Sequence, residues 1–259
     1  FEPYDAEFAT LLKKGRENLK KLGVNFSKSF ADSQFNADEL ELNNFVSPQV
    51  LPLIIDPDRW NFLPDRDMIK MLSDGKKNIL FTGRMAPNKK QTDLIKMMPS
   101  LLEHNPDVRL CLVGHNFNMS FPYVREVYEL IDKLNLKESV WISGKINEKE
   151  LKACFMCADL YFSASEHEGF GVPLIEAMWF DLPVLAYKST AIPETLSSAA
   201  FMIDDKKDVK YIAMLVNLLL NDKEIRHEII MEQRKVREKY SLKQLQPVYR
   251  NLIKELLND

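Results

Sequence analysis

From about residue 76 onward, short apolar runs alternate with longer segments that have helical periodicity. Strands are predicted at residues 78–82, 108–113, 139–143, 159–163, 183–187 and 200–203. Helices are predicted at residues 91–103, 123–134, 148–157, 173–180, 207–220, 223–240 and 242–257, with one short turn near Pro193. Strands that alternate with helices of about ten to fifteen residues indicate βαβ units. We therefore expect an α/β fold with a parallel, doubly wound sheet.

Residues 1–75 show a different pattern. They are predicted to contain a helix at 6–22, a short strand and turn at 27–33, a helix at 37–43 and a strand at 49–55. These elements are too few for a complete α/β domain. We interpret residues 1–75 as the tail of a first domain plus a linker, and residues 76–259 as a second domain. The last helix, at 242–257, is expected to pack back on the first part.

The predicted helix at 6–22 is basic and amphipathic, with apolar residues at helical spacing in LLKKGRENLKKL. Membrane-surface helices and calmodulin targets have this appearance. A solvated helix that packs on a domain is several times more common, and we favour that interpretation.

The 259-residue chain is 46% hydrophobic and has a formal net charge of -3, with 35 Lys and Arg against 38 Asp and Glu. This length can bury a substantial core, and the balanced charge argues against nucleic acid as a partner. No apolar run approaches the roughly 18 residues of a membrane span. The opening FEPYDAEFAT lacks signal-peptide features and begins with Phe, which indicates a fragment or a chain without its first part. A cytoplasmic protein is expected.

Three cysteines cannot all pair within one chain. Cys154 and Cys157 form a CxxC pattern, which occurs in redox motifs, whereas a structural zinc site would need a second pair that the sequence lacks. Both cysteines lie in an apolar helical pattern, so packing in the core is the favoured interpretation. A reducing, cytosolic environment fits this cysteine usage.

The first candidate site is TGRMAPNKK at residues 82–90, just past a predicted strand. Ligands of open parallel sheets bind beyond the carboxyl ends of the strands. Arg84 and Lys89 could clamp the two phosphates of a diphosphate, Arg84 by its planar fork and Lys89 as a point charge. Judged on this segment alone, two ordinary surface cations are the favoured interpretation. The sequence has no GxxxxGK[ST], which excludes an ordinary P-loop.

The second candidate site is SEHEGFGVPLIEAM at residues 165–178. Gly169 and Gly171 would let the backbone approach a ligand, and free amides at the start of the helix near Pro173 would attract a phosphate. Glu176, expected in the first turn of that helix, could accept the hydroxyl protons of a ribose. Alternatively, Glu176 only compensates the helix dipole and Glu168 is a solvated loop carboxylate. A GxG between spaced glutamates, paired with an upstream Arg/Lys loop, arises rarely by chance.

From about residue 30 onward, the chain resembles retaining glycosyltransferases of family 4, which have the GT-B fold. The resemblance rests on ADSQFNADEL…VLPLIID, ILFTGRMAPNKK, VWISGKINEKEL, ADLYFSASEHEGFGVPLIEAM and LPVLAYKSTAIPE, in the family's usual order. It implies two Rossmann-like domains that face a cleft, of which the C-terminal one binds a nucleotide-sugar donor. Glu168 and Glu176 match the family's E-x7-E signature. Arg84 and Lys89 match its diphosphate-binding pair.

The resemblance implies a role for each matched residue. Arg84 and Lys89 would neutralise the departing diphosphate and Glu168 would contact the transferred sugar, which makes these three the predicted catalytic residues. Glu176 would hold the ribose. The other predicted donor-binding residues are Gly83, Gly144, Lys145, Ile146, Gly169, Phe170, Gly171 and Val172. Among them, 169–171 would contact phosphate and sugar through the backbone, and 144–146 would pass beside the base. No metal or other cofactor is expected, because the cations and the helix terminus neutralise the charge.

The resemblance also implies that the anomeric configuration is retained, by a front-face reaction in which the departing phosphate helps to deprotonate the acceptor hydroxyl. Glu168 as a glycosidase-like nucleophile is the less favoured alternative. The family's glycine-rich loop and catalytic histidine are not identifiable, and His167 is interpreted as a loop residue. Three positions depart from the family pattern: Lys90 and Asp181 stand where glycine is usual, and Ala164 replaces a proline.

The resulting prediction is the transfer of a hexose from a nucleotide diphosphate sugar to a glycan or lipid-linked acceptor. The opening FEPYD…LKKGRENLKKLG is most similar to mannosyltransferase-like members of surface polysaccharide assembly, which suggests GDP-mannose, with UDP-sugars as the other option. One alternative is a donor-binding half that does not turn over. Another is a sugar-nucleotide epimerase or a phosphorylase on the same fold. A lipid-linked acceptor would imply peripheral contact with the inner face of the membrane.

Overall fold

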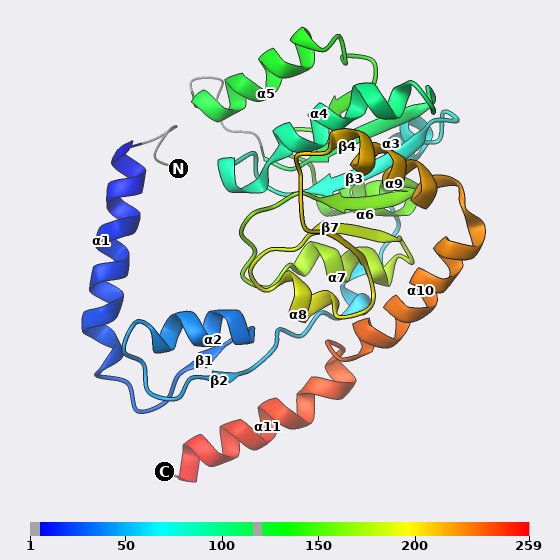
Figure 1. The fold of residues 1–259 in the computed structure, drawn as a ribbon. Coiled ribbons are helices and arrows are strands. Elements are labelled where there is room, and N and C mark those ends of the chain that lie inside the picture. Colours follow the sequence, from blue (N-terminus) through cyan, green and yellow to red (C-terminus); the bar gives the residue numbers. More distant parts are fainter. Residues whose placement is uncertain (1–5, 116–120, 259) are drawn as a thin grey trace.

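The computed structural model describes residues 6–115 and 121–258, and at its centre lies a parallel sheet of six strands (Figure 1). The strands are β3 (Lys77–Thr82), β4 (Val108–Val113), β5 (Val140–Ile142), β6 (Leu160–Ser163), β7 (Val184–Tyr187) and β8 (Phe201–Ile203). Their order across the sheet is β5-β4-β3-β6-β7-β8. The chain winds outward from β3, returns to β6 beside it, and winds outward in the other direction. The predicted doubly wound α/β sheet is therefore confirmed, with its switch point between β3 and β6.

Helices cover both faces of this sheet. They are α4 (Gln91–Leu102), α5 (Pro122–Lys133), α6 (Glu148–Cys157), α7 (Val172–Trp179), α8 (Ile192–Leu196), α9 (Val209–Asn221) and α10 (Lys223–Glu238). Buried residues of α4, α5 and α9 form one hydrophobic cluster, and those of α6, α7 and α8 form another. The sheet lies between these two clusters, so both of its faces are removed from water.

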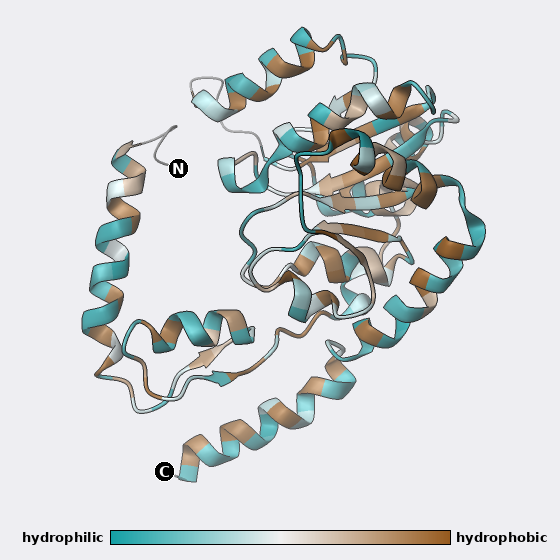
Figure 2. Ribbon diagram, in the orientation of Figure 1, coloured by the Kyte–Doolittle hydropathy of each residue, from teal (hydrophilic) through white to brown (hydrophobic). Residues whose placement is uncertain are grey.

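The strands contribute side chains to both clusters in alternation. In β3, Ile79 and Phe81 belong to the first cluster, whereas Leu80 belongs to the second. Successive side chains of a strand point to opposite faces, so a strand buried on both faces must be apolar at nearly every position. This explains the continuous apolar runs of the sequence. Figure 2 shows the same distribution, with hydrophobic residues concentrated on the strands and hydrophilic ones on the outer helices.

The chain before the sheet contains further helices and a second, smaller sheet, and its residues Ile55, Trp60 and Leu72 belong to the second hydrophobic cluster. It contains α1 (Ala6–Gly23), β1 (Phe30–Ala31), α2 (Gln34–Glu41), β2 (Gln49–Val50), the 3-10 helix η1 (Pro57–Trp60) and α3 (Arg66–Leu72). The pair β1 and β2 is parallel and makes a sheet of its own. The strand predictions at 27–33 and 49–55 are wrong in length, because only two residues of each are paired. The helix predicted at 37–43 begins earlier, because the Ser33 side chain caps it by accepting from Asn36 N.

The final helix, α11 (Leu242–Asn258), runs back toward β1 and β2 (Figure 1). The Tyr249 hydroxyl donates a hydrogen bond to Pro52 O at 2.9 Å. The division of the chain into domains at residue 75 remains a prediction. None of the helices in the described residues combines the length and the apolar character that crossing a bilayer requires.

The cysteines are free thiols, with Cys111 and Cys154 buried. Burial raises the pKa of Cys154 to about 12. The thiolate that redox chemistry requires is therefore disfavoured, which agrees with the interpretation of the CxxC pattern as core packing.

Candidate functional site

The two candidate segments follow the two strands that flank the switch point. The loop that carries Arg84 and Lys89 follows β3, and the loop that carries Glu168 follows β6. Because β3 and β6 pair in parallel, with Ile79 opposite Leu160, both loops leave the same edge of the sheet. The topology thus brings together side chains that stand 79 positions apart in the sequence.

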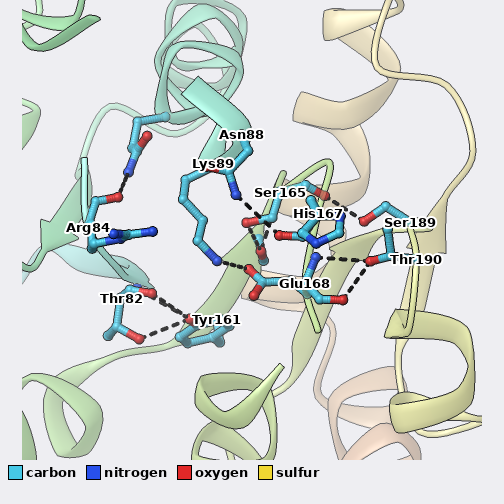
Figure 3. A network of polar contacts seen from close by, with 12 residues as sticks. Thr82, Arg84, Asn88, Lys89, Tyr161, Ser165, His167, Glu168, Ser189 and Thr190 are labelled. Carbon is cyan, nitrogen blue, oxygen red and sulfur yellow. Dashed lines mark hydrogen bonds and ion pairs between the residues drawn. The ribbon is translucent and has the colours of Figure 1, made fainter. Parts of the chain in front are cut away.

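Lys89 and Glu168 form an ion pair between the two loops (Figure 3). Lys89 Nζ lies 2.6 Å from Glu168 Oε1, and the two side chains are only 18% and 15% exposed. Neither residue is therefore the solvated surface charge that the sequence left open. Lys89 ends a short 3-10 helix, η2 (Pro87–Lys89), which the sequence analysis does not predict. In the same helix, Asn88 Nδ2 donates to His167 O at 3.4 Å, which adds a second link between the loops.

Arg84 is exposed at the same edge, and its backbone is held in place. Its carbonyl oxygen accepts a hydrogen bond from Gln91 Nε2 at 2.8 Å. Its guanidinium has no hydrogen-bond or ion-pair partner among the described residues, and no dashed line reaches it in Figure 3. Arg84 is therefore a cation on a fixed backbone that is available to an anionic ligand.

The loop after β6 is pinned by the segment after β7. Thr190 Oγ1 donates to Glu168 O at 2.7 Å and accepts from Glu168 N at 2.9 Å. One residue earlier, Ser189 Oγ donates to Ser165 O at 2.7 Å. These bonds fix the backbone on both sides of the Glu168 side chain, so the carboxylate has a defined position (Figure 3).

The start of α7 presents unpaired amide groups. Gly171 caps the helix with a φ of 86°, in the left-handed region that favours glycine. The helix then begins at Val172 and Pro173, which agrees with the expectation that Pro173 lies in its first turn. No described residue accepts a hydrogen bond from the amides of 169–172. Amides at a helix N-terminus attract anions, so this loop has the donors that a phosphate needs.

The carbonyl of Gly169 is bound by the N-terminal part of the chain. It accepts hydrogen bonds from Ser33 Oγ at 2.9 Å and from Asn36 Nδ2 at 3.1 Å. A Cβ atom at 169 would lie 3.1 Å from that same nitrogen, so glycine permits the approach. The next residue, Phe170, turns its ring into the core, where it meets the Tyr240 ring at 5.3 Å. The buried ring of Phe170 is thus not available to a ligand, and the expected contact through its backbone stays a prediction.

Glu176 lies in the second turn of α7, not in the first turn as expected, because the helix begins at Val172. Compensation of the helix dipole is confined to the first turn, so it does not account for this carboxylate. The Glu176 side chain is 7% exposed, and its Oε1 accepts from Arg59 Nη1 at 2.7 Å. Burial raises the pKa of Glu176, and the charge of Arg59 opposes that rise.

A buried tyrosine of β6, Tyr161, is influenced by the charges of both glutamates. Burial raises the pKa of Tyr161, the hydrogen bonds with Thr82 oppose that rise, and the charges of Glu168 and Glu176 add to it. Its hydroxyl lies 3.0 Å from Thr82 Oγ1 at the end of β3. Tyr161 therefore stays neutral and ties the two switch-point strands together beneath the loops.

The remaining predicted donor-binding residues lie around this edge. Gly83 passes so close to Gly114 that a Cβ atom at 114 would lie 2.3 Å from Gly83 O. Gly144 has a φ of 66°, and its carbonyl accepts from Ser143 Oγ at 2.8 Å. Lys145 is exposed, whereas Ile146 packs against the second hydrophobic cluster.

A cavity of about 1220 Å³ opens beside the site. Arg84, Asn88 and His167 line it from the sheet side, and Asp32 and Asn36 line it from the N-terminal part. Its far wall includes apolar side chains of α1, namely Phe8, Leu11, Leu12 and Leu19. Within residues 6–115 and 121–258, no group of His, Cys, Asp or Glu side chains is arranged to hold a metal ion.

The sequence that carries these features matches a known protein family. The sequence profile described as "Glycosyl transferases group 1" matches residues 66–236. The chain belongs to this family. The glycosyl transferase match includes Arg84, the Lys89–Glu168 pair and Glu176, but it begins after Arg59.

Individual relatives agree with this assignment. A GDP-mannose-dependent alpha-(1-6)-phosphatidylinositol monomannoside mannosyltransferase of Mycolicibacterium smegmatis is 27% identical over 231 residues, covering 82% of this chain. The chain spans 58% of that relative's length.

Solved structures share the fold. Anabaena Alr3699/HepE in complex with UDP and glucose matches with a TM-score of 0.78 at 21% identity, over 92% of this chain and 67% of that one. The sucrose-phosphate synthase of Thermosynechococcus elongatus matches with a TM-score of 0.79 at 19% identity, over 95% and 62%. The predicted GT-B fold class is confirmed.

Four residues that contact the site were not predicted from the sequence, namely Ser33, Asn36, Arg59 and Thr190. Thr190 had a usable signal, because it follows the β7 strand and so lies at the same edge as the other two loops. Arg59 had none, since it stands in a turn-forming segment far from the sheet edge in sequence.

Proposed function

We propose that this chain provides the donor side of a retaining hexosyltransferase, which moves mannose from GDP-mannose to a glycan or lipid-linked acceptor. The observation that carries the proposal is the convergence at the switch point. The Arg84 guanidinium and the amides of 169–172, which have no hydrogen-bond partner in the described part of the chain, lie with the Lys89–Glu168 pair at one edge of the sheet. This set supplies cations and N–H donors for a diphosphate beside a carboxylate for sugar hydroxyls.

Each group has a separate task in this proposal. Arg84 and Lys89 stabilise the negative charge that develops on the diphosphate as its bond to the anomeric carbon breaks. The amides of 169–172 bind phosphate and sugar oxygens, and Glu168 accepts hydrogen bonds from the transferred hexose. Glu176 holds the ribose, and 144–146 lie beside the base. With these charges in place, neither a metal ion nor another cofactor is needed to neutralise the leaving group.

Retention follows from a front-face reaction. The acceptor oxygen forms its new bond on the face that the diphosphate leaves, and the hydroxyl proton passes to the departing phosphate oxygen. Glu168 is poorly suited to act as a covalent nucleophile, because Lys89 already engages its carboxylate at 2.6 Å. The Mycolicibacterium relative is named as GDP-mannose-dependent and as acting on a phosphatidylinositol mannoside, which favours GDP-mannose here. We place the protein in the cytoplasm, in peripheral contact with the inner membrane face when the acceptor is lipid-linked.

Calorimetric titration with GDP, UDP and their hexose derivatives tests donor binding. A radiolabelled transfer assay with glycan and lipid-linked acceptors then tests turnover. We expect GDP-mannose to bind and to yield product with the donor's anomeric configuration. A donor-binding half would bind without transfer, and an epimerase would convert the nucleotide sugar without an acceptor. If no nucleoside diphosphate binds, the proposal is wrong.

A further inference from the structure

Glu176 is a buried carboxylate with a single strong partner. Oε1 accepts from Arg59 Nη1 at 2.7 Å, and the Glu176 side chain is almost fully removed from water. Among the described residues, no other donor reaches the carboxylate within hydrogen-bond distance. A buried carboxylate without a cation is strongly destabilised in its ionised form, so this one contact favours the ionised form of Glu176.

Arg59 is itself held in a defined orientation. It lies in η1, whose cap Asp56 accepts a hydrogen bond from Asp58 N at 2.9 Å. The Arg59 guanidinium lies 4.7 Å from the centroid of the Trp60 ring, and Trp60 is anchored in the core. Its second nitrogen, Nη2, lies 3.5 Å from Glu148 Oε1 at the start of α6. The fork of Arg59 therefore joins two helices of the sheet domain to the segment that precedes it.

We propose that Arg59 is a positioning residue of the donor site, which holds Glu176 ionised and oriented to bind the nucleotide. This inference rests on the proposed function, in which Glu176 binds the ribose. With Oε1 bound to Arg59, Oε2 is the oxygen that accepts the ribose hydroxyl. Arg59 precedes the region matched by the family profile, so neither the motif nor the family match points to it.

The proposal predicts a pH dependence with a definite sign. The charged groups that face Glu176 are Arg59 from η1 and, through Arg59, Glu148 from α6. Tyr161 of β6 is also near, but burial keeps its hydroxyl neutral. Burial raises the pKa of Glu176 and Arg59 opposes it, so removing Arg59 raises that pKa further. Binding that needs the carboxylate is then lost at a higher pH than in the wild type.

The test is calorimetric titration of GDP and UDP between pH 5.5 and 8.5 with Arg59→Met, Arg59→Lys and Glu176→Gln. The informative quantity is the ratio of variant to wild-type affinity at each pH, because titration of the nucleotide phosphate cancels. For each unit by which the Glu176 pKa rises, the ionised fraction below that pKa falls about tenfold. We expect Arg59→Met to lose roughly tenfold in affinity at the acid end and to recover toward pH 8.5.

The other variants separate charge from structure. Arg59→Lys keeps a cation and should show a smaller pH-dependent loss, whereas Glu176→Gln should bind weakly at every pH. Arg66→Met is the matched control, since Arg66 is exposed and its side chain makes no hydrogen bond, ion pair or ring contact among the described residues. A loss for Arg59→Met that is the same at every pH overturns the proposal. If Arg59→Met does not fold, a pH-independent loss in Arg59→Lys overturns it instead. A wild type that binds no nucleotide overturns the proposed function itself.

Discussion

Lys89 Nζ and Glu168 Oε1 lie 2.6 Å apart and join the loops that follow the two central strands of the sheet. The pair is largely buried, so each charge depends on the other. Removing one member of such a pair leaves the other without compensation. The same contact also places a cation and a carboxylate where the diphosphate and the sugar of a donor would meet.

Replacing Lys89 should therefore affect both binding and stability. A charged hydrogen bond contributes about 1.5–3 kcal/mol, so Lys89→Met should weaken binding of GDP or UDP by at least about tenfold. The melting temperature should also fall, because Glu168 loses its partner. Titration calorimetry and thermal unfolding measure the two effects. The control is Lys96→Met, since the Lys96 side chain is half exposed and Asp93 is its only ion-pair partner among the described residues. Equal effects of the two variants would contradict the assignment.

Replacing Arg84 should separate binding from stability. Its guanidinium is exposed and unpaired among the described residues, so Arg84→Met should leave the melting temperature unchanged. Loss of one group that stabilises the leaving charge typically lowers a rate by about 10²–10³. Transfer assays should show that loss, while Arg125→Met, another exposed arginine, should behave as wild type. An unchanged transfer rate in Arg84→Met would show that Arg84 does not stabilise the leaving group.

Gly171→Ala should damage the start of α7. The φ of 86° disfavours any residue with a Cβ, and that atom would lie 2.9 Å from Leu174 Cδ1. The left-handed conformation alone costs roughly 1–2 kcal/mol, and the amides of 169–172 would shift with it. We expect a lower melting temperature and weaker nucleotide binding.

Gly15→Ala is the matched control for this glycine variant. A Cβ atom at Gly15 would meet no atom within 4 Å, and alanine is favoured inside a helix. Its stability should be equal to or slightly above that of the wild type. If the two alanine variants gave the same melting temperature and affinity, the conformation of Gly171 would have no role in the site.

The sheet and its site-bearing loops were predictable because parallel strands buried on both faces leave continuous apolar runs. Once the strands are located, Arg84 and Glu168 become candidate ligand-binding residues, because ligands of such sheets bind at the carboxyl ends of the strands. The lengths of the short strands β1 and β2 were not predictable. They depend on how the two strands pair with each other and not on the hydrophobic periodicity of either segment. Arg59 was not predictable either, because its contact with Glu176 spans 117 positions and depends on how η1 docks.

Two departures from the family pattern have a conformational explanation. Lys90 has a φ of 52° and Asp181 a φ of 54°, both in the left-handed region where glycine is favoured. Each of these side chains makes ion pairs that glycine could not make. Lys90 Nζ lies 3.1 Å from Glu166 Oε2, so this lysine is engaged within the loops. At both positions, a residue that is less suited than glycine to the left-handed conformation forms an ion pair. The family motif alone does not predict this.

Asp181 makes the stability of the protein depend on pH. Its carboxylate pairs with Arg234 Nη2 at 2.5 Å and with Arg237 Nη1 at 2.8 Å, which connects the end of α7 to α10. The hydrogen bond from Arg234, with the charge of Arg237, holds the pKa of Asp181 below its ordinary value. The unfolded chain therefore binds the proton more readily than the folded one. The stabilisation is complete above an unfolded pKa of about 3.9 and is lost as the pH falls through the folded value.

Asp181→Asn should accordingly be less stable than the wild type at pH 7, and the difference should shrink as the pH falls below about 3.9. The carboxylate is partly exposed, so solvent screening limits the expected difference to about 1 kcal/mol or less. Urea unfolding of both proteins at several pH values measures it, and added salt should reduce it. Asp132→Asn removes a more exposed pair with Lys137 and should show a smaller difference at pH 7. If the Asp181→Asn difference were the same at pH 3 and pH 7, the loss would come from altered packing or backbone conformation rather than from the charge of Asp181.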